Sequence, residues 1–280
     1  MDHYCVLGNP VEHSKSPGIH ARFAELTGQS LAYGRQLAPL DGFADTLRQW
    51  IAGGARGCNV TVPFKFEAFR LANNATPRAQ LAEAANTLRF DAAGHIEADN
   101  TDGIGLVNDI QVNAGMSLAG RDVLLLGAGG AAAGVLGPLL AAAPRRLVVA
   151  NRTHAKAQAL VTRHAGQPAL QALLQKTELS AQAPHGLEAD FDVIINATAS
   201  SLGGGDVPVD ARVLKPGALA YDMMYGEAAQ GFAGWARAHG AVPRDGLGML
   251  VEQAAEAFLF WRGVRPPSAQ VLQEMREALA

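Results

Sequence analysis

A short apolar strand that runs directly into a glycine-rich turn constrains the fold of this chain more than any other feature. Residues 123–126 read VLLL, the turn reads GAGGAAAG, and a second apolar strand follows at residues 147–150. Gly127 and Gly129 match the first two glycines of the dinucleotide-binding fingerprint, and Ala132 takes its third place. Glycines there permit a tight turn and the close approach of a pyrophosphate to a helix N-terminus. The pattern predicts a Rossmann-type unit that binds a dinucleotide.

The end of the second strand indicates which dinucleotide. NAD-binding units carry an acidic residue there for the ribose 2′-hydroxyl, whereas this chain has Asn151-Arg152-Thr153 and, one turn later, Lys156. Arginine and lysine can pair with a 2′-phosphate, and no carboxylate stands there to repel it. The sequence therefore favours NADP over NAD. The alternative is that Asn151 or Thr153 caps a helix whose basic residues face solvent.

Length, charge and cysteine usage narrow the class of protein. With 280 residues, the chain can form one large domain or two medium ones. A net charge of −3 offers no electrostatic argument for a nucleic-acid or membrane partner, so we expect a small-molecule partner. Cys5 and Cys58 lack CxxC spacing, and the histidines lack an HExxH pattern, so we expect no disulfide framework and no metal. The cysteine usage and an N-terminus without signal-peptide features predict a cytoplasmic protein.

One segment passes a simple length and charge test for a membrane span. Residues 123–144 contain no charged side chain and are long enough to cross a bilayer. They are also rich in glycine and contain Pro138. A buried strand, a glycine turn and a buried helix explain the same residues with less strain, and we prefer that interpretation.

The stretch GCNVTVPFK, residues 57–65, contains the best candidate for acid–base chemistry. A β-branched run predicts a strand end, and Pro63 suits the first turn of a following helix, which would include Lys65. The helix dipole opposes a cation there and makes the ammonium easier to deprotonate, as a general acid or base requires. The alternative is a solvated lysine that begins an amphipathic helix.

Other polar residues lie where helices are expected to begin. Ser16-Pro17 is typical of an N-cap and first helical residue, so that Ser14 and Ser16 could bind a carboxylate or phosphate, or Ser16 could simply cap. Asp102, in DNTDG, could orient Lys65 or cap the next helix. Gln253 is a polar residue in an apolar helix and needs a partner, which either the core or a substrate supplies.

Strand and helix patterns alternate along the chain, which predicts an α/β fold with helices on both faces of a sheet. Expected helices include residues 17–27, 43–51 and 81–85, and residues 86–90 are an expected strand. Two later strands, residues 192–195 and 218–221, would end beside the cofactor crevice. Ala197, Thr198 and Met223 would then border the cofactor, although Met223 could equally fill the core. The glycine-rich run 201–205 is an expected mobile loop.

Taken together, these motifs resemble the shikimate dehydrogenase family. GNPVEHSKSP, GCNVTVPFK, ANT, DNTDG, GAGGA, NRT, INAT, YDMMY and DGLGMLVEQAA all look like family motifs and occur in family order. The resemblance implies a cytoplasmic oxidoreductase of aromatic amino-acid biosynthesis that reduces 3-dehydroshikimate with NADPH, acting as a monomer or homodimer. It also implies two domains, with residues 1–102 plus 245–280 binding substrate, residues 103–244 forming the Rossmann-like NADP-binding domain, and the active site between them.

The resemblance also implies roles for individual residues. Lys65 would be the acid/base and Asp102 its partner, which also binds a ring hydroxyl. The substrate-binding residues would be Ser14, Ser16 and Tyr225 at the carboxylate and Thr61, Asn86 and Gln253 at the ring hydroxyls. The cofactor-binding residues would be Gly127, Ala128, Gly129, Gly130 and Ala131 at the pyrophosphate, Asn151, Arg152, Thr153 and Lys156 at the 2′-phosphate, and Ala197, Thr198, Met223 and Gly246 along the nicotinamide half.

The chain departs from the family pattern at Pro77, Glu83 and Ala133, where relatives often carry an acidic residue, a glycine and a basic residue. These departures concern cofactor contacts more than the reaction. Two other functions remain open from the sequence. One is a dehydrogenase for quinate or a related polyol acid, and the other is a non-catalytic NADP-binding sensor on the same fold.

Overall fold

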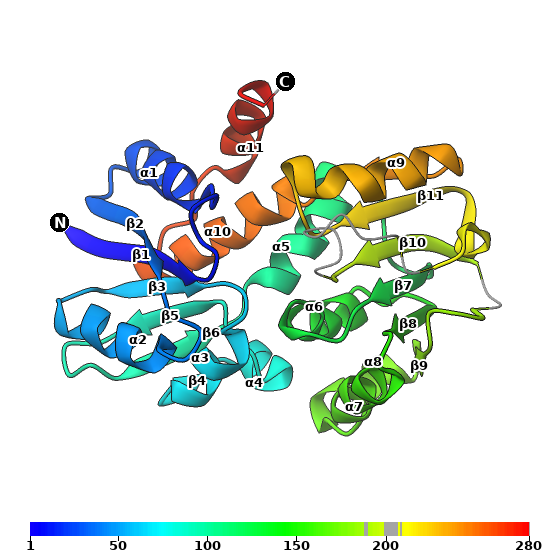
Figure 1. Ribbon diagram of the computed structural model, residues 1–280, viewed down its shortest axis with the longest axis horizontal. Coiled ribbons are helices and arrows are strands. Elements are labelled where there is room, and N and C mark those ends of the chain that lie inside the picture. Colours follow the sequence, from blue (N-terminus) through cyan, green and yellow to red (C-terminus); the bar gives the residue numbers. More distant parts are fainter. Residues whose placement is uncertain (188–189, 199–206, 208, 280) are drawn as a thin grey trace. The chain divides into compact units, whose positions relative to one another are not determined.

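The glycine-rich turn joins strand β7 (Asp122–Leu126) to helix α6 (Gly130–Ala141) in the computed structural model of the chain (Figure 1). The structure describes residues 1–187, 190–198, 207 and 209–279. These residues form two units, of which unit 1 comprises Met1–Gly105 with Leu250–Ala280 and unit 2 comprises Leu106–Met249. The divisions fall inside helices α5 (Asp102–Asn108) and α10 (Leu247–Arg262). Each unit is therefore described by itself.

Unit 2 contains a six-stranded sheet in which every described pairing is parallel. Numbered along the chain within the unit, the strands lie in the order 3-2-1-4-5-6, which is that of a doubly wound dinucleotide-binding fold. The prediction of a Rossmann-type unit is confirmed. From one edge to the other the strands are β12 (Val242–Arg244), β11 (Leu214–Asp222), β10 (Phe191–Asn196), β7, β8 (Arg146–Ala150) and β9 (Glu178–Gln182).

The central strands of unit 2 are continuous apolar runs because both of their faces are covered. All five residues of β7 are buried, and Leu124 and Leu126 share a core with Phe232 of α9. Helices and turns connect the strands: α6, α7 (His154–Ala165), α8 (Gln171–Leu174), α9 (Gln230–Ala238), the π-helical η1 (Asp109–Asn113) and the 3-10 turns η2 (Pro168–Leu170), η4 (Ala211–Val213) and η5 (Gly226–Ala229).

The apolar segment 123–144 is thus a buried strand, a turn and a buried helix, as preferred from the sequence. Pro138 lies inside α6, and most residues of this helix are buried. Among the helices of the described residues, none is both long enough and apolar enough to span a bilayer.

Unit 1 contains a second six-stranded sheet, with mixed strand directions. Strand β1 is parallel to both of its neighbours, whereas β5 is antiparallel to both of its own. From one edge to the other the strands are β2 (Leu31–Leu37), β1 (Asp2–Gly8), β3 (Gly57–Val60), β5 (Thr87–Phe90), β6 (Ile96–Asp99) and β4 (Asn74–Ala75). The alternation of apolar side chains directs Cys5 and Leu7 of β1 into one core.

Helices cover both faces of the unit 1 sheet. On one face, Phe43 and Leu47 of α2 (Phe43–Ala52) join the core of Cys5 and Leu7, together with Ala68 of α3 (Lys65–Leu71). On the other face, aromatic rings of α1 (Ser16–Thr27) meet those of α10, and Phe23 lies edge-on to Phe258. The remaining helices are α4 (Pro77–Ala82) and α11 (Ser268–Glu277). The prediction of an α/β fold is confirmed.

Several helix starts differ from the sequence-based expectation. Helix α4 begins at Pro77, four residues before its expected start at residue 81, because the Thr76 hydroxyl accepts a bond from Ala79 N–H and Pro77 suits the first turn. Pro63 precedes α3 by two residues and is not part of its first turn. Glu83 ends α4 in the left-handed region, with a φ of 50°. That conformation favours glycine.

A buried charge cluster ties the start of the π-helical segment of unit 2 to its sheet. The Asp109 carboxylate accepts hydrogen bonds from Tyr221 at 2.7 Å and from Arg244 at 2.6 and 2.8 Å, and it is fully buried. Burial by itself would raise the pKa of Asp109. The bonds from Arg244 and Tyr221 outweigh it and hold that pKa below its ordinary value of 3.8.

This lowered pKa predicts how the stability of the protein depends on pH. A carboxyl whose pKa falls on folding contributes stability that is complete above its unfolded pKa and is lost as pH falls through its folded pKa. We therefore expect the free energy of unfolding, from urea titrations, to fall steadily as the pH is lowered from about 4. Asp109→Asn should make that fall shallower. Parallel pH dependences for the two proteins would contradict a role for Asp109.

Candidate functional site

The predicted substrate residues of unit 1 lie at one end of the strands of its sheet. This end of the strands is called the site edge of the sheet. Strands β1, β3 and β6 all run toward this edge, while β5 starts from it because it is antiparallel to β3 and β6. The segments that follow β1, β3 and β6, and the residue before β5, therefore meet there. These positions hold Ser14 and Ser16, Thr61 and Lys65, Asp102, and Asn86.

Lys65 and Asp102 lie in contact at this edge. Lys65 is the first residue of α3, Asp102 is the first residue of α5, and Lys65 Nζ lies 2.5 Å from Asp102 Oδ2. The side chains are 13% and 6% exposed, so little water separates or screens them. The sequence could not show that these residues, 37 positions apart, would meet. The pair combines a proton-bearing cation with an orienting carboxylate.

Asn86 connects this pair to Gln253. Its side-chain NH₂ group donates to Asp102 Oδ1 at 2.8 Å and to Gln253 Oε1 at 3.2 Å. Gln253 in turn donates to the carbonyl of Leu250 at 2.8 Å, which directs its oxygen toward Asn86 and Thr101. The partner that Gln253 requires is thus supplied by protein groups. These amides orient the Asp102 carboxylate and leave its second oxygen to Lys65.

The two serines lie in and before the start of α1. The prediction that Ser16 caps this helix is wrong, because α1 begins at Ser16 itself and Lys15 is the cap residue, without a side-chain bond. Ser14 Oγ instead accepts a hydrogen bond from Ser16 N–H at 3.3 Å. Arg35, a residue of β2, donates two hydrogen bonds to the Ser14 carbonyl, at 2.6 and 3.1 Å. These bonds hold the segment that contains Ser14 against β2.

Sequence reasoning missed a set of polar groups beneath these residues. Tyr33 donates to Asn59 Oδ1 at 2.7 Å, and Asn59 donates to Thr87 Oγ1 at 3.0 Å. Burial raises the pKa of Tyr33 well above its ordinary value, so that its hydroxyl stays a donor. His20 stacks on Tyr33 with ring centroids 4.3 Å apart, and burial lowers its pKa to about 3. The signal that could have identified Asn59 is a polar amide inside an apolar strand.

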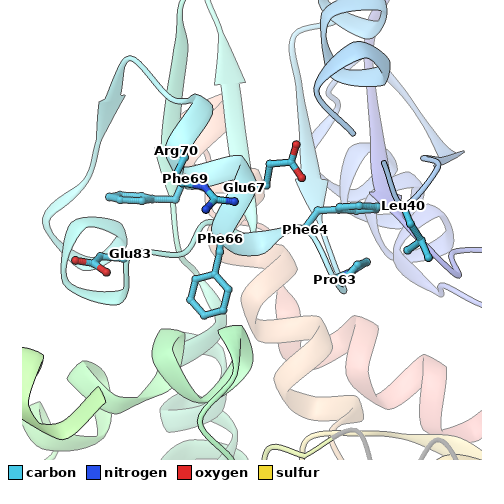
Figure 2. Close-up of a pocket in the computed structure, with 8 residues that line it drawn as sticks. All are labelled: Leu40, Pro63, Phe64, Phe66, Glu67, Phe69, Arg70 and Glu83. Carbon is cyan, nitrogen blue, oxygen red and sulfur yellow. The ribbon is translucent and has the colours of Figure 1, made fainter. Parts of the chain in front are cut away.

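Unit 1 also contains a cavity of about 640 Å³ (Figure 2). None of its lining residues is a predicted site residue, although several are neighbours of Lys65 in the chain. The cavity combines aromatic rings with scattered charges and lacks the convergent polar groups that mark a small-molecule site. We therefore take as the candidate site the polar residues described above, which we call the polar cluster: Ser14, Ser16, Thr61, Lys65, Asn86, Asp102 and Gln253. The lining residues are Leu40, Pro63, Phe64, Phe66, Glu67, Phe69, Arg70 and Glu83.

In unit 2, the glycine turn lies at the carboxyl end of the sheet, where the strand order reverses between β7 and β10. Gly127 has a φ of 113°, and a Cβ atom there would lie 3.0 Å from the Ala197 carbonyl oxygen, so glycine is required. Helix α6 starts one residue after Gly129 without a side-chain cap or an acidic residue in its first turn. Its free N–H groups suit a pyrophosphate. Ala128, Gly130 and Ala131 complete this turn.

The end of β8 presents the predicted 2′-phosphate residues. Arg152 and Lys156 are both exposed, and their side chains form no ion pair within the described part of the chain. Thr153 precedes α7 but makes no capping bond, and Asn151 donates to the Thr153 carbonyl at 2.9 Å. The capping alternative therefore has no hydrogen bond to support it. Two free cations remain at a strand end that faces the ligand crevice of such folds.

The ends of β10 and β11 lie at the same carboxyl end of the sheet as the glycine turn. Thr198 donates to Asn196 Oδ1 at 2.7 Å, and Met223 N–H donates to the Asn196 carbonyl at 3.0 Å. Gly246 lies against this segment, since a Cβ atom there would be 2.3 Å from the Met223 carbonyl oxygen. Tyr225, a predicted substrate residue, also belongs to unit 2 and precedes η5. The glycine-rich run 201–205, predicted to be mobile, lies outside the described residues.

Three family models match the chain. The shikimate dehydrogenase substrate binding domain matches residues 6–88, the shikimate/quinate 5-dehydrogenase model matches residues 110–203, and the shikimate 5′-dehydrogenase C-terminal domain matches residues 246–279. The first therefore lies in unit 1, where the polar cluster is, and the second lies in unit 2.

Individual relatives resemble the chain over its whole length. A shikimate dehydrogenase (NADP(+)) of Acidovorax sp. (strain JS42) is 69% identical over 279 residues, covering 100% of this chain and 97% of the relative. An Ael1 enzyme from Pseudomonas putida is 45% identical with a TM-score of 0.83, covering 98% of both chains. A shikimate 5-dehydrogenase from Thermus thermophilus, in complex with NADP(H) and shikimate, is 29% identical with a TM-score of 0.83 and full coverage of both. The chain belongs to the shikimate dehydrogenase family.

Proposed function

We propose that this chain catalyses the reversible, NADPH-dependent reduction of 3-dehydroshikimate to shikimate, with Lys65 as the acid/base. The proposal rests above all on the contact between Lys65 Nζ and Asp102 Oδ2, inside a polar cluster at one sheet edge. The 69% identity to a shikimate dehydrogenase (NADP(+)) over almost the entire chain supports the same reaction. Unit 1 is the proposed substrate-binding domain and unit 2 the proposed cofactor-binding domain.

The polar residues of unit 1 suit a substrate that carries a carboxylate and several hydroxyls. Ser14 and Ser16 supply hydroxyls at the start of α1, where the helix dipole and free N–H groups favour an anion. Thr61 and Gln253 supply a hydroxyl and an amide near Lys65, which suit the ring hydroxyls, and Asn86 lies between Gln253 and Asp102. We assign the carboxylate to the serines and the ring to the amide side of the cluster.

Lys65 is positioned to move a proton to or from a substrate oxygen. In the reductive direction, the ammonium donates a proton to the carbonyl oxygen as that oxygen gains charge, and a positive donor at that point stabilises the transition state. Asp102 keeps the ammonium oriented through one oxygen while Asn86 holds the other. In the oxidative direction the neutral amine accepts the proton of the substrate hydroxyl.

The residues of unit 2 fit NADPH. The uncapped N-terminus of α6 and the close approach that Gly127 allows suit the pyrophosphate, since a Cβ atom at Gly127 would lie 3.0 Å from the Ala197 carbonyl oxygen. Arg152 and Lys156 would hold the 2′-phosphate, and Ala197, Thr198, Met223 and Gly246 would lie along the nicotinamide half. When bound, NADPH supplies a hydride to the carbonyl carbon.

An absorbance assay tests the proposed reaction directly. Purified protein is incubated with shikimate and either NADP or NAD, and formation of the reduced nicotinamide is followed. We expect rapid reduction of NADP and little reduction of NAD. If NADP were reduced only when quinate replaced shikimate, the assignment of shikimate as the substrate would be contradicted. Binding of NADPH without turnover of either acid would contradict the enzyme assignment.

Cofactor preference should depend on Arg152. We expect Arg152→Ala to raise KM for NADP by about 10- to 100-fold, since a hydrogen-bonded charge pair contributes roughly 1.5–3 kcal/mol. KM for NAD should change little, because NAD lacks the 2′-phosphate that Arg152 is proposed to bind. Arg163→Ala, farther along α7, is a control for general effects on that helix. An equal rise in KM for both cofactors would contradict the role of Arg152.

We further propose that the protein acts in the cytoplasm as a monomer or homodimer and without nucleic acid. Two free, buried cysteines are typical of proteins from reducing compartments. The net charge of −3 gives the chain no general attraction for a polyanion. The described residues contain no group of three or more potential metal ligands, and the reaction assigned here requires none.

A further inference from the structure

Thr87 is a fully buried polar residue that the proposed mechanism does not use. It is the first residue of β5 and directly follows Asn86, whose amide holds Asp102. Its hydroxyl lies between two side-chain amides, 3.0 Å from Asn59 Nδ2 and 3.0 Å from Asn86 Oδ1. A buried hydroxyl in this position can determine how its neighbours are oriented, because each of its hydrogen bonds has a direction.

The direction of these bonds follows from neighbours that can only donate or only accept. Asn59 donates from Nδ2 to the Asn86 backbone carbonyl at 3.1 Å, and a carbonyl can only accept, so Nδ2 also faces Thr87. Tyr33, which stays protonated, donates to the other side of the Asn59 amide. Thr87 therefore accepts from Asn59 and donates its single hydroxyl proton to Asn86 Oδ1 at 3.0 Å, which is a nearer acceptor than Thr101 Oγ1 at 3.5 Å.

Asn86 is thereby oriented by two donors. Its Oδ1 accepts from the Thr87 hydroxyl and from Thr101 N–H, the latter at 2.8 Å. The NH₂ group then has to face Asp102 and Gln253. If the amide were rotated by half a turn, its oxygen would face the Asp102 carboxylate, and the two acceptors would repel each other.

We propose that Thr87 is a positioning residue for the reaction, which holds the Asn86 amide in the orientation that fixes Asp102 against Lys65. This inference rests on the proposed function, because it assigns Thr87 a part in the same chemistry. Thr87 reaches the reacting groups only through Asn86 and Asp102. Its hydroxyl should therefore matter for turnover more than for the binding of shikimate.

Two substitutions separate the hydroxyl from the bulk of the side chain. Thr87→Val keeps the shape and loses the hydroxyl, whereas Thr87→Ser keeps the hydroxyl and loses a methyl group. We expect Thr87→Val to lower kcat for shikimate roughly tenfold, with less than a threefold change in KM, and Thr87→Ser to restore kcat to within about threefold of wild type. Urea unfolding of both variants establishes that the assays are made on folded protein.

A double-mutant cycle with Lys65 distinguishes positioning from a merely structural role. If Thr87 acts through Asp102 and Lys65, Thr87→Val should change the residual rate of a Lys65→Ala protein by less than about threefold, because the interaction it supports is already lost. A tenfold loss in both backgrounds would overturn the inference. Equal kcat values for Thr87→Val and wild type would overturn it as well.

A measurement on the Asn86 side-chain amide tests the inference without turnover. In ¹⁵N spectra, this NH₂ signal is assigned by its absence from an Asn86→Ala protein. We expect its protons to exchange slowly with solvent in wild type and Thr87→Ser and distinctly faster in Thr87→Val. If the Asn86 NH₂ protons exchanged with solvent as slowly in Thr87→Val as in wild type, the inference would be overturned. Failure of the wild-type protein to oxidise shikimate would overturn the proposed function, while this signal would still decide whether Thr87 orients Asn86.

Discussion

Lys65→Ala should lower the turnover of shikimate by about 10²–10⁴-fold, the usual contribution of a general acid or base. The substitution removes the only group that the mechanism assigns to proton transfer, and it leaves the Asp102 carboxylate without its cation. Steady-state kinetics with NADP and shikimate measure the effect. KM for shikimate should change much less than kcat, since the serines and amides proposed to bind substrate remain in place.

Two further variants define the role of the lysine. Lys65→Arg keeps a positive charge beside Asp102 but cannot release a proton near neutral pH, so it should be almost as inactive as Lys65→Ala. Lys176→Ala removes an exposed lysine of unit 2 and should leave turnover unchanged. Substantial activity in Lys65→Arg would mean that charge alone is sufficient, and near-normal activity in Lys65→Ala would remove Lys65 from the chemistry.

Arg78→Ala should lower the free energy of unfolding by about 3–5 kcal/mol, the cost of leaving one member of a buried ion pair without its partner. Arg78 donates to both oxygens of the Asp99 carboxylate, which is completely buried, and to Glu256 of α10 at 3.0 Å. Burial disfavours the charge of Arg78, yet the carboxylates raise its pKa above the ordinary value. Once the guanidinium is removed, the Asp99 charge remains buried.

Urea unfolding at neutral pH measures this loss, and two matched variants interpret it. Arg78→Lys keeps the charge but not the two-pronged geometry and should fall between wild type and Arg78→Ala. Arg48→Ala breaks an exposed pair with Asp45 and should cost no more than about 0.5 kcal/mol. If Arg78→Ala lowered the free energy of unfolding as little as Arg48→Ala, solvent or a local rearrangement would have to compensate for the unpaired charge of Asp99.

The Arg78 cluster also bears on activity. Asp99 accepts the backbone N–H of Asn100 at 2.7 Å, so it anchors the turn that leads to Asp102. Glu256 lies one turn after Gln253 on α10. Arg78 therefore holds two segments that carry site residues, and its loss is expected to reduce turnover in proportion to the displacement of that turn.

Much of the fold could be predicted from the sequence because it depends on local pattern. The strand–turn–helix around Gly127 follows from an apolar run and the conformations that only glycine allows, and the structure confirms it. The predicted helix ends at residues 27 and 51 agree with the structure to within one residue. The errors lie at helix starts such as Pro77 and Ser16, where a cap residue one or two positions away decides the boundary.

By itself, then, the sequence determined which elements form, that a glycine-rich turn and a helix follow β7, and which residue types are available for acid–base chemistry. The tertiary structure alone decided which of those residues meet. Lys65 and Asp102 are 37 positions apart, and Asn86 and Gln253 are 167 apart. Hydrophobic periodicity reports the environment of a residue and its neighbours within a turn or a strand. Strand order and register bring the ends of distant strands together, and so they place Asn86 beside Asp102 and Asp102 beside Lys65.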